Sequence, residues 1–218
     1  MANFIEPKMI RILNSFSVET VKIPNKNYEM GMYPITIAEY MHFVQETDSH
    51  YPEWIENDSK YKDINLTDNA PIIGVSWYDA IAYCKWLSEK TGKRYRLPYD
   101  RNEWLYSAGI NKIEDIEEYG KYAWYKDNSQ NTTHIVGEKL PNELNLYDMY
   151  GNVWEWIDED FENLARDEQS PGFDDITICG GGWNSNMTDS YILGHHPYFK
   201  ENYIGFRILL EYENERKN

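Results

Sequence analysis

Cysteine is scarce in this chain, with only two among 218 residues, Cys84 and Cys179, which lie far apart in the sequence. A disulfide framework would need more cysteines at closer spacing, and no CxxC pair is present that could hold a metal. Cys84 falls in a helical pattern, so we expect it to pack as a small apolar side chain.

Long apolar runs are also missing. No segment reaches the roughly 18 apolar residues of a membrane span, and the N-terminal MANFIEPKMIRIL has no small-residue cleavage site. We therefore expect a protein without a signal peptide or membrane span, located in the cytoplasm or in a virion such as a phage particle.

Positive charge is in deficit, because 21 Lys and Arg face 37 Asp and Glu and the net charge is −16. A field of this sign repels phosphate backbones, which argues against nucleic-acid binding. Solubility is the simplest role for the excess of acid, and attraction of cations or of a basic partner is the alternative.

Aromatic residues are plentiful, with 19 Tyr and 8 Trp, and 41% of the residues are hydrophobic. These side chains suit a core with buried hydrogen bonds and also suit binding surfaces. The chain contains no linker, repeat or low-complexity stretch. We expect a single domain over residues 1–210 and a frayed tail, EYENERKN, over 211–218.

Three helices are predicted. The first spans 36–47, where Thr36 and Glu39 form a capping box and apolar residues follow at i, i+3, i+4 and i+7. The second spans 76–92, with the same kind of box at its start and a glycine at its end. The third lies near 100–108.

The remainder favours short strands in irregular structure. Residues 47–70 are polar and rich in Asp and Asn, which indicates a long loop. Helices followed by turn-rich β-structure favour an α+β fold. Strand-like pieces lie at 16–23, 28–35, 153–157 and 205–210.

Four sequence blocks, in this order, resemble the formylglycine-generating enzyme, or sulfatase-modifying factor, family. The GNVWEW and GFR motifs are specific to it. The resemblance implies a C-type lectin-like fold with two to three helices, small twisted antiparallel sheets and much irregular structure. The blocks are GMYPITIAEYMHFV (31–44), PIIGVSWYDAIAYCKWLSEKTGKRYRLPYDRNEWLYSAG (71–109), PNELNLYDMYGNVWEW (141–156) and GGGW…IGFR (180–207).

The resemblance leaves the function open. Some members are copper-dependent oxygenases that convert a sulfatase cysteine to formylglycine, and others are domains of non-haem iron sulfoxide synthases. A third group consists of ligand-binding proteins whose C-terminal stretch is diversified by retroelements, phage receptor-binding proteins among them. The site must therefore decide the function.

The copper-binding residues of the oxygenases are replaced here. Those members follow a glycine pair with a serine, and place two cysteines three and eight positions later. Gly182 stands at the serine position, and Ser185 and Ser190 stand at the cysteine positions. Cu(I) is a soft ion that prefers thiolates, so we expect no copper and no formylglycine generation. A family enzyme, a metal-dependent oxidase or oxygenase with an atypical site, is the alternative.

Histidines are the other candidate metal ligands. His195 and His196 are adjacent, so in a strand they would point to opposite faces, and we expect exposed loop residues instead.

A structural calcium ion is implied by the family resemblance. Its ligands would be the side chains of Asp148 and Glu155 and the carbonyls of Gly151 and Val153. Hard oxygen ligands of this mixture suit Ca²⁺. The alternative, in which Asp148 caps a turn and Glu155 pairs with a basic side chain, fits the sequence equally well.

The segment 183–203 is predicted to display a ligand-binding surface. Most of its polar and aromatic residue types can be reached by changing adenines in an Asn codon, which is how retroelements diversify this fold. Met187, Lys200 and Glu201 cannot be reached in this way, so the match is partial. The mixture resembles an antibody paratope, so the partner would be a protein or a glycan. A neutrally drifted polar loop is the alternative. The candidate ligand-binding residues are Trp183, Asn184, Ser185, Asn186, Asp189, Ser190, Tyr191, His195, His196, Tyr198 and Phe199.

Three hypotheses therefore stand. The chain is a non-catalytic ligand-binding protein, with diversification by a retroelement as a possible origin of its surface, or an enzyme of the same family, or a small structural subunit of a larger assembly.

Overall fold

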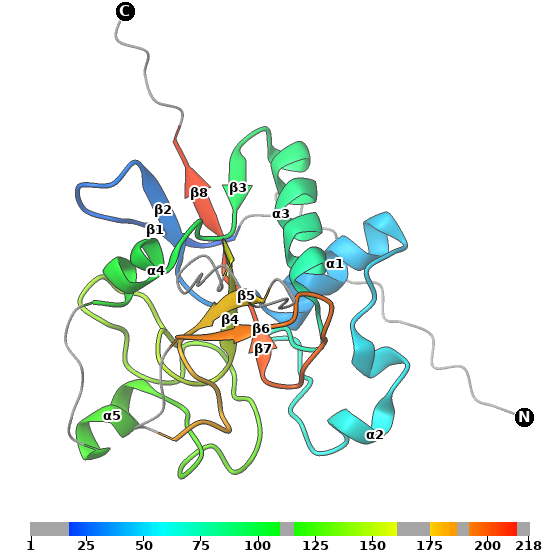
Figure 1. Cartoon of the computed structure of the whole chain (residues 1–218), viewed down its shortest axis with the longest axis vertical. Coiled ribbons are helices and arrows are strands. Elements are labelled where there is room, and N and C mark those ends of the chain that lie inside the picture. The colour runs from blue at the N-terminus through cyan, green and yellow to red at the C-terminus, as the bar shows by residue number, and fades with distance from the viewer. Residues whose placement is uncertain (1–17, 110–115, 161–174, 187–191, 213–218) are drawn as a thin grey trace, which may run out of the picture.

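The computed structural model describes residues 18–109, 116–160, 175–186 and 192–212, which form two small sheets and several short helices (Figure 1). This arrangement confirms the predicted α+β class. The first sheet has the order β1-β2-β8-β3 and the second has the order β6-β5-β4-β7. The strands are β1 (Thr20–Lys22), β2 (Tyr28–Gly31), β3 (Arg94–Arg96), β4 (Trp154–Asp160), β5 (Ile176–Cys179), β6 (Ile192–His195), β7 (Ile204–Gly205) and β8 (Leu209–Glu211).

Strand pairing is antiparallel throughout the first sheet. In the second sheet β5 pairs antiparallel with β4 and with β6, whereas β7 pairs parallel with β4. Strands β5 and β6 were not expected from the sequence. Each has only four residues, ITIC and ILGH, which is too short for an alternating pattern to be recognised.

The three predicted helices are confirmed as α1 (Ile37–Thr47), α3 (Trp77–Thr91) and α4 (Arg101–Ala108). Both predicted capping boxes are formed, at Thr36 and at Ser76. None of the described helices is long and apolar enough to span a membrane. The described residues form three further short helices that were not predicted, and two of them lie within residues 47–70, where a loop was expected. They are η1 (Glu53–Ile55), α2 (Asp58–Tyr61) and α5 (Ile116–Tyr122).

The main core lies where α1 and α3 pack against both sheets, and it is rich in aromatic rings. Tyr83 of α3 lies 5.8 Å from Tyr40 of α1 and 5.4 Å from Phe206, measured between ring centroids. Each fully buried side chain of this size contributes roughly 1.5–3 kcal/mol to stability. Cys84 is buried in the same cluster, as expected, and burial raises the pKa of its thiol.

A buried ion pair joins the two sheets. The guanidinium of Arg207, which precedes β8, donates to both carboxylate oxygens of Glu155 in β4, with Nη2–Oε1 at 2.7 Å and Nε–Oε2 at 2.8 Å. Arg207 also donates to the carbonyls of Gly31 at 3.0 Å and Tyr147 at 2.9 Å. The Trp104 indole of α4 donates to Glu155 at 2.7 Å. One charge pair thus holds β4, the end of β2 and α4 together.

The C-terminal tail starts later than predicted. Glu211 was expected to begin it, but this residue is the last of β8 and pairs with Arg94 at 3.0 Å and Arg96 at 3.3 Å. Residues 213–218 of the expected tail lie outside the described part of the chain.

Removal of the Arg207 charge tests the role of this ion pair. Arg207→Met leaves the carboxylate of Glu155 buried without a counter-ion, so we expect the free energy of unfolding to fall by about 3–5 kcal/mol. The double variant Glu155→Gln/Arg207→Met should lose clearly less than the sum of the two single variants.

Urea denaturation measures all three variants. Arg101→Met is the matched control, because Arg101 pairs with Glu159 at 3.9 Å near the surface, and its loss should cost about 1 kcal/mol or less. Strictly additive losses for Arg207 and Glu155 would show that the pair is not coupled.

Candidate functional site

The predicted ligand-binding segment surrounds β6 and the turn that follows it. In the described residues, the turn at 197–201 is hydrogen-bonded to the first residue of α3 and to the segment before it. The Trp77 amide donates to the Pro197 carbonyl at 3.1 Å, and the Gly74 amide donates to the Glu201 carbonyl at 2.9 Å. Three candidate residues, Asp189, Ser190 and Tyr191, lie outside the described part of the chain.

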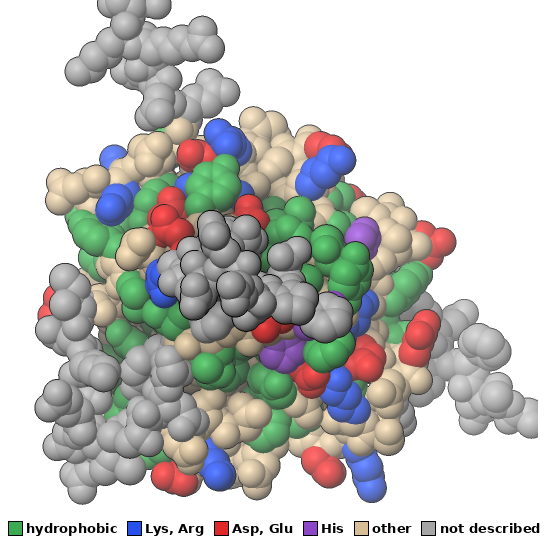
Figure 2. Space-filling view, viewed as in Figure 1, with side chains coloured by type: hydrophobic (Ala, Val, Ile, Leu, Met, Phe, Trp, Pro, Cys, Tyr) green, Lys and Arg blue, Asp and Glu red, His purple; other side chains and the backbone are tan. Residues whose placement is uncertain are grey.

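Three exposed aromatic side chains, Tyr78, Tyr198 and Phe199, form what we call the aromatic patch. Tyr198 is 66% exposed and Phe199 is 54% exposed. The ring of Tyr198 lies 4.6 Å from that of Tyr78 at the start of α3. Figure 2 shows hydrophobic and histidine side chains on the face that carries β6. Tyr78 was missed from the sequence, because nothing in a helix's first turn indicates that a turn far along the chain packs beside it.

Salt bridges hold the turn beneath the aromatic patch. The ammonium of Lys200 lies 3.0 Å from the carboxylate of Asp79 and donates to the Tyr51 carbonyl at 3.0 Å. Glu201 pairs with Lys60 of α2 at 3.2 Å. Of the three residues that do not fit the Asn-codon pattern, Lys200 and Glu201 have anchoring roles, and Met187 lies outside the described part of the chain.

Asp79 is the centre of this anchor. Burial disfavours the ionised carboxyl, but hydrogen bonds from Ser76, His50 and Lys200 outweigh burial and lower the pKa of Asp79. His50 Nδ1 lies 2.8 Å from the carboxylate. The carboxylate of Asp79 therefore keeps its negative charge at neutral pH, and its salt bridge with Lys200 holds the turn against α3.

The two adjacent histidines differ from the expectation of exposed loop residues. His195 is the last residue of β6 and is half-buried, with its ring 5.7 Å from those of Trp156 and Phe199. His196 is also half-buried, and its ring lies 4.9 Å from that of Phe199. Packing between aromatic rings accounts for both positions. Within the described residues, no group of three or more His, Cys, Asp or Glu side chains is placed to hold a metal ion.

Ser185 lies beneath the surface. Its side chain is buried, and its hydroxyl accepts hydrogen bonds from the Trp154 indole at 3.0 Å and the Gly182 amide at 2.9 Å. The hydroxyl thus satisfies two buried donors and is not presented to a ligand. Of its neighbours, Asn184 is exposed, whereas Trp183 is half-buried and donates to the Asn202 carbonyl at 3.0 Å. Asn186 is exposed.

The expected calcium ligands include one carboxylate that is already occupied. Both oxygens of Glu155 accept hydrogen bonds from Arg207, and one also accepts from Trp104. This is the alternative role that the sequence allowed, pairing with a basic side chain. Because the guanidinium already neutralises Glu155, the set of Glu155, Asp148 and the carbonyls of Gly151 and Val153 fits calcium poorly.

Asp148 is the second carboxylate of that set. It is buried, its Oδ2 accepts from the Gly137 amide at 2.8 Å, and the Asn152 amide lies 3.5 Å from its Oδ1. Burial raises the pKa of Asp148 to about 6. Calcium binding at this carboxylate stays a prediction.

The sulfatase-modifying factor enzyme 1-like domain matches residues 8–212. The inactive C-alpha-formylglycine-generating enzyme 2 of Bos taurus is 28% identical over 63% of the chain and 49% of its own length. The chaperone protein LppX of Paenibacillus barcinonensis is 25% identical over 82% of the chain and 76% of its own length.

The serine/threonine-protein kinase pkn1 of Chlamydia pneumoniae is 24% identical over 85% of the chain. The chain spans 33% of the length of this kinase and 49% of that of the bovine protein, so it corresponds to only part of either.

Two solved structures are similar over most of the chain. PvdO from Pseudomonas aeruginosa has a TM-score of 0.67 and 21% identity, and covers 90% of this chain and 92% of its own. Treponema denticola variable protein 1 has a TM-score of 0.66 with the same identity and the same coverage of both chains. These similarities confirm the predicted fold, of the C-type lectin-like kind.

Asp148→Asn tests the buried carboxyl. The pKa of Asp148 in the folded state, about 6, lies above its value in the unfolded state, so the folded state binds the proton more tightly. The contribution of this group to the stability of the wild type therefore falls as the pH rises from about 4 to 6. The amide removes this dependence and can still accept from Gly137. In calcium-free buffer we therefore expect the free energy of unfolding of the variant, relative to that of the wild type, to rise by about 2–3 kcal/mol between pH 4 and pH 8.

Thermal and urea unfolding at several pH values measure this difference. A constant difference at all pH values would contradict the buried, protonatable carboxyl. Calcium added to both proteins at pH 8 addresses the ion: if it binds at Asp148, it stabilises the wild type and has no effect on the variant.

Proposed function

The chain belongs to the sulfatase-modifying factor enzyme 1-like family, and from this premise we propose that it is a non-catalytic member that binds a protein or glycan ligand through its aromatic patch. The observation that carries the proposal is the buried hydroxyl of Ser185, which stands at a position where the copper-dependent members would need a thiolate.

The hydroxyl of Ser185 has a structural task that opposes metal binding. It accepts from Trp154 and Gly182, so its lone pairs are directed at buried N–H groups. A serine hydroxyl ionises far less readily than a thiol and is a hard donor, whereas Cu(I) prefers soft sulfur. At this position the chain therefore lacks the thiolate that formylglycine generation with copper and oxygen would need. The name of the bovine relative describes it as inactive, which supports the existence of family members that lack this activity.

The aromatic patch supplies the chemistry of recognition. Exposed Tyr and Phe rings give large contact areas with few rotatable bonds, and residues of this kind dominate binding energies at interfaces. The anchor at Lys200 and Glu201 keeps the turn ordered before a ligand arrives, which lowers the entropic cost of binding. The residue types at the exposed positions, together with the fold similarity to a variable protein, support diversification of this surface by a retroelement.

The double variant Tyr198→Ala/Phe199→Ala tests the aromatic patch. We expect the wild type to bind saturably to at least one member of a glycan array or a panel of bacterial surface proteins. The double variant should bind that ligand at least about tenfold more weakly, because truncation of interface hot spots costs about 2 kcal/mol or more.

Tyr212→Ala is the matched control, because Tyr212 is an exposed tyrosine that follows β8 in the other sheet. This control should keep wild-type affinity. Equal affinity of the double variant, or equal loss in the control, would contradict binding through the aromatic patch, as would the absence of any saturable ligand.

A further inference from the structure

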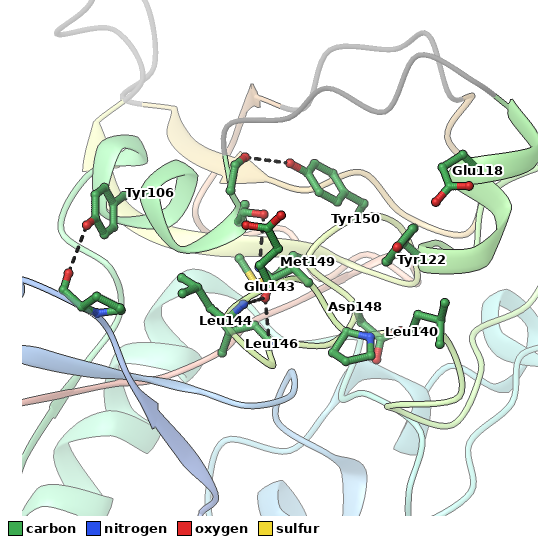
Figure 3. A pocket seen from close by; sticks show the side chains of 15 residues that line it. Tyr106, Glu118, Tyr122, Leu140, Glu143, Leu144, Leu146, Asp148, Met149 and Tyr150 are labelled. Atoms are coloured by element: carbon green, nitrogen blue, oxygen red, sulfur yellow. Dashed lines mark hydrogen bonds between the residues drawn. The ribbon is translucent and has the colours of Figure 1, made fainter.

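A cavity of about 750 Å³ opens between α4, α5 and the loop 140–150, and the proposed function does not use it (Figure 3). No member of the aromatic patch lines it. Its volume lies within the range of pockets that hold small organic ligands.

Hydrogen bonds fix the walls of this cavity. The Tyr150 hydroxyl donates to the Gly109 carbonyl at 3.2 Å, and the Tyr106 hydroxyl donates to the Pro24 carbonyl at 3.0 Å. Asn142 donates to the Ser107 carbonyl at 2.8 Å, which joins the loop to α4. Figure 3 shows these tyrosines at the edge of the cavity. A site whose walls are already ordered loses little entropy when a ligand enters.

The lining combines apolar surface with negative charge. Leucine side chains and Met149 supply the apolar part, and Glu118 and Glu143 supply accessible carboxylates. Asp148 also belongs to the lining, but its carboxyl is buried and accepts from the Gly137 amide. Among the described residues that line the cavity, none is basic. Glu118 pairs with the nearby Lys121 at 2.6 Å, whereas Glu143 forms no salt bridge within the described residues.

The aromatic wall can also hold a cation. The ammonium of Lys26 lies over the ring of Tyr106, 4.3 Å from its centroid. A ring that faces an ammonium at this distance attracts it through its negative face. Lys26 occupies the ring of Tyr106 and illustrates the interaction that an ammonium ligand would make with another tyrosine of this wall, Tyr122 or Tyr150.

We propose that this cavity binds an organic ammonium ion with an apolar body. The ammonium would lie toward Glu143, and the apolar body would lie among the leucine side chains and the tyrosine rings. An organic anion of the same size would face the same carboxylate and be repelled.

A pair of ligands with the same ring and opposite charge tests the proposal: phenethylammonium and phenylacetate. In calorimetric titrations of the full chain at low ionic strength, we expect phenethylammonium to bind saturably, with a Kd of about 1 mM or tighter. Phenylacetate should not bind. Added salt should weaken binding of the ammonium, because part of the attraction is between exposed charges.

Glu143→Gln provides the test by mutation, because Glu143 is exposed and its replacement should not disturb folding. We expect this variant to bind phenethylammonium about three- to tenfold more weakly. Glu89→Gln on α3 is the matched control, an exposed glutamate that does not line the cavity, and should bind as the wild type does.

Three outcomes would overturn the proposal: equal binding of phenylacetate, no saturable binding of phenethylammonium up to about 10 mM, or equal affinity of Glu143→Gln and the wild type. Tyr198→Ala/Phe199→Ala should bind phenethylammonium normally. Failure at the aromatic patch and failure at the cavity can therefore be told apart.

Discussion

The ion pair between Arg207 and Glu155 is the constraint on which the rest of the structure depends. Both side chains are almost fully buried, and the pair lies where the two sheets meet. A charge inside a protein is tolerated only when it is paired and hydrogen-bonded, and here the backbone carbonyls and the Trp104 indole complete the partners. The same pairing occupies the carboxylate that a calcium ion would need.

Around this fixed centre the chain builds a surface from short pieces. β6 has four residues and β7 has two, so neither contributes much stability of its own. The turn between them is held instead by side-chain anchors on α2 and α3. Residues at its exposed positions, such as Tyr198 and Phe199, can change without loss of the anchors at Lys200 and Glu201. A scaffold that separates anchoring from display suits a binding protein.

Part of this architecture could be predicted from the sequence, because some features are encoded locally. The capping boxes at Thr36 and Ser76 define the starts of α1 and α3 within a few neighbouring residues, and both were predicted. The GNVWEW and GFR motifs identified the fold through resemblance. Short strands such as β5 could not be recognised, because four residues carry no usable periodicity.

Much of the candidate site escaped prediction because it depends on contacts between distant segments. The burial of Ser185 follows from its hydrogen bond to Trp154, and Tyr78 joins the aromatic patch through a turn more than a hundred positions later. The partner of Glu155 was foreseen only as some basic side chain. In each case the chemical type of residue was visible in the sequence, but its neighbour was not.

We propose that hydroxyls at positions 185 and 190 leave a family scaffold that can bind a ligand but cannot use copper. Competition for Cu(I) against a chromophoric chelator under anaerobic conditions tests it most directly, with the wild type and Ser185→Cys/Ser190→Cys side by side. We predict that the wild type does not compete and that the thiol variant takes up copper. Stoichiometric copper in the wild type, or conversion of a sulfatase peptide's cysteine to formylglycine, would contradict the account.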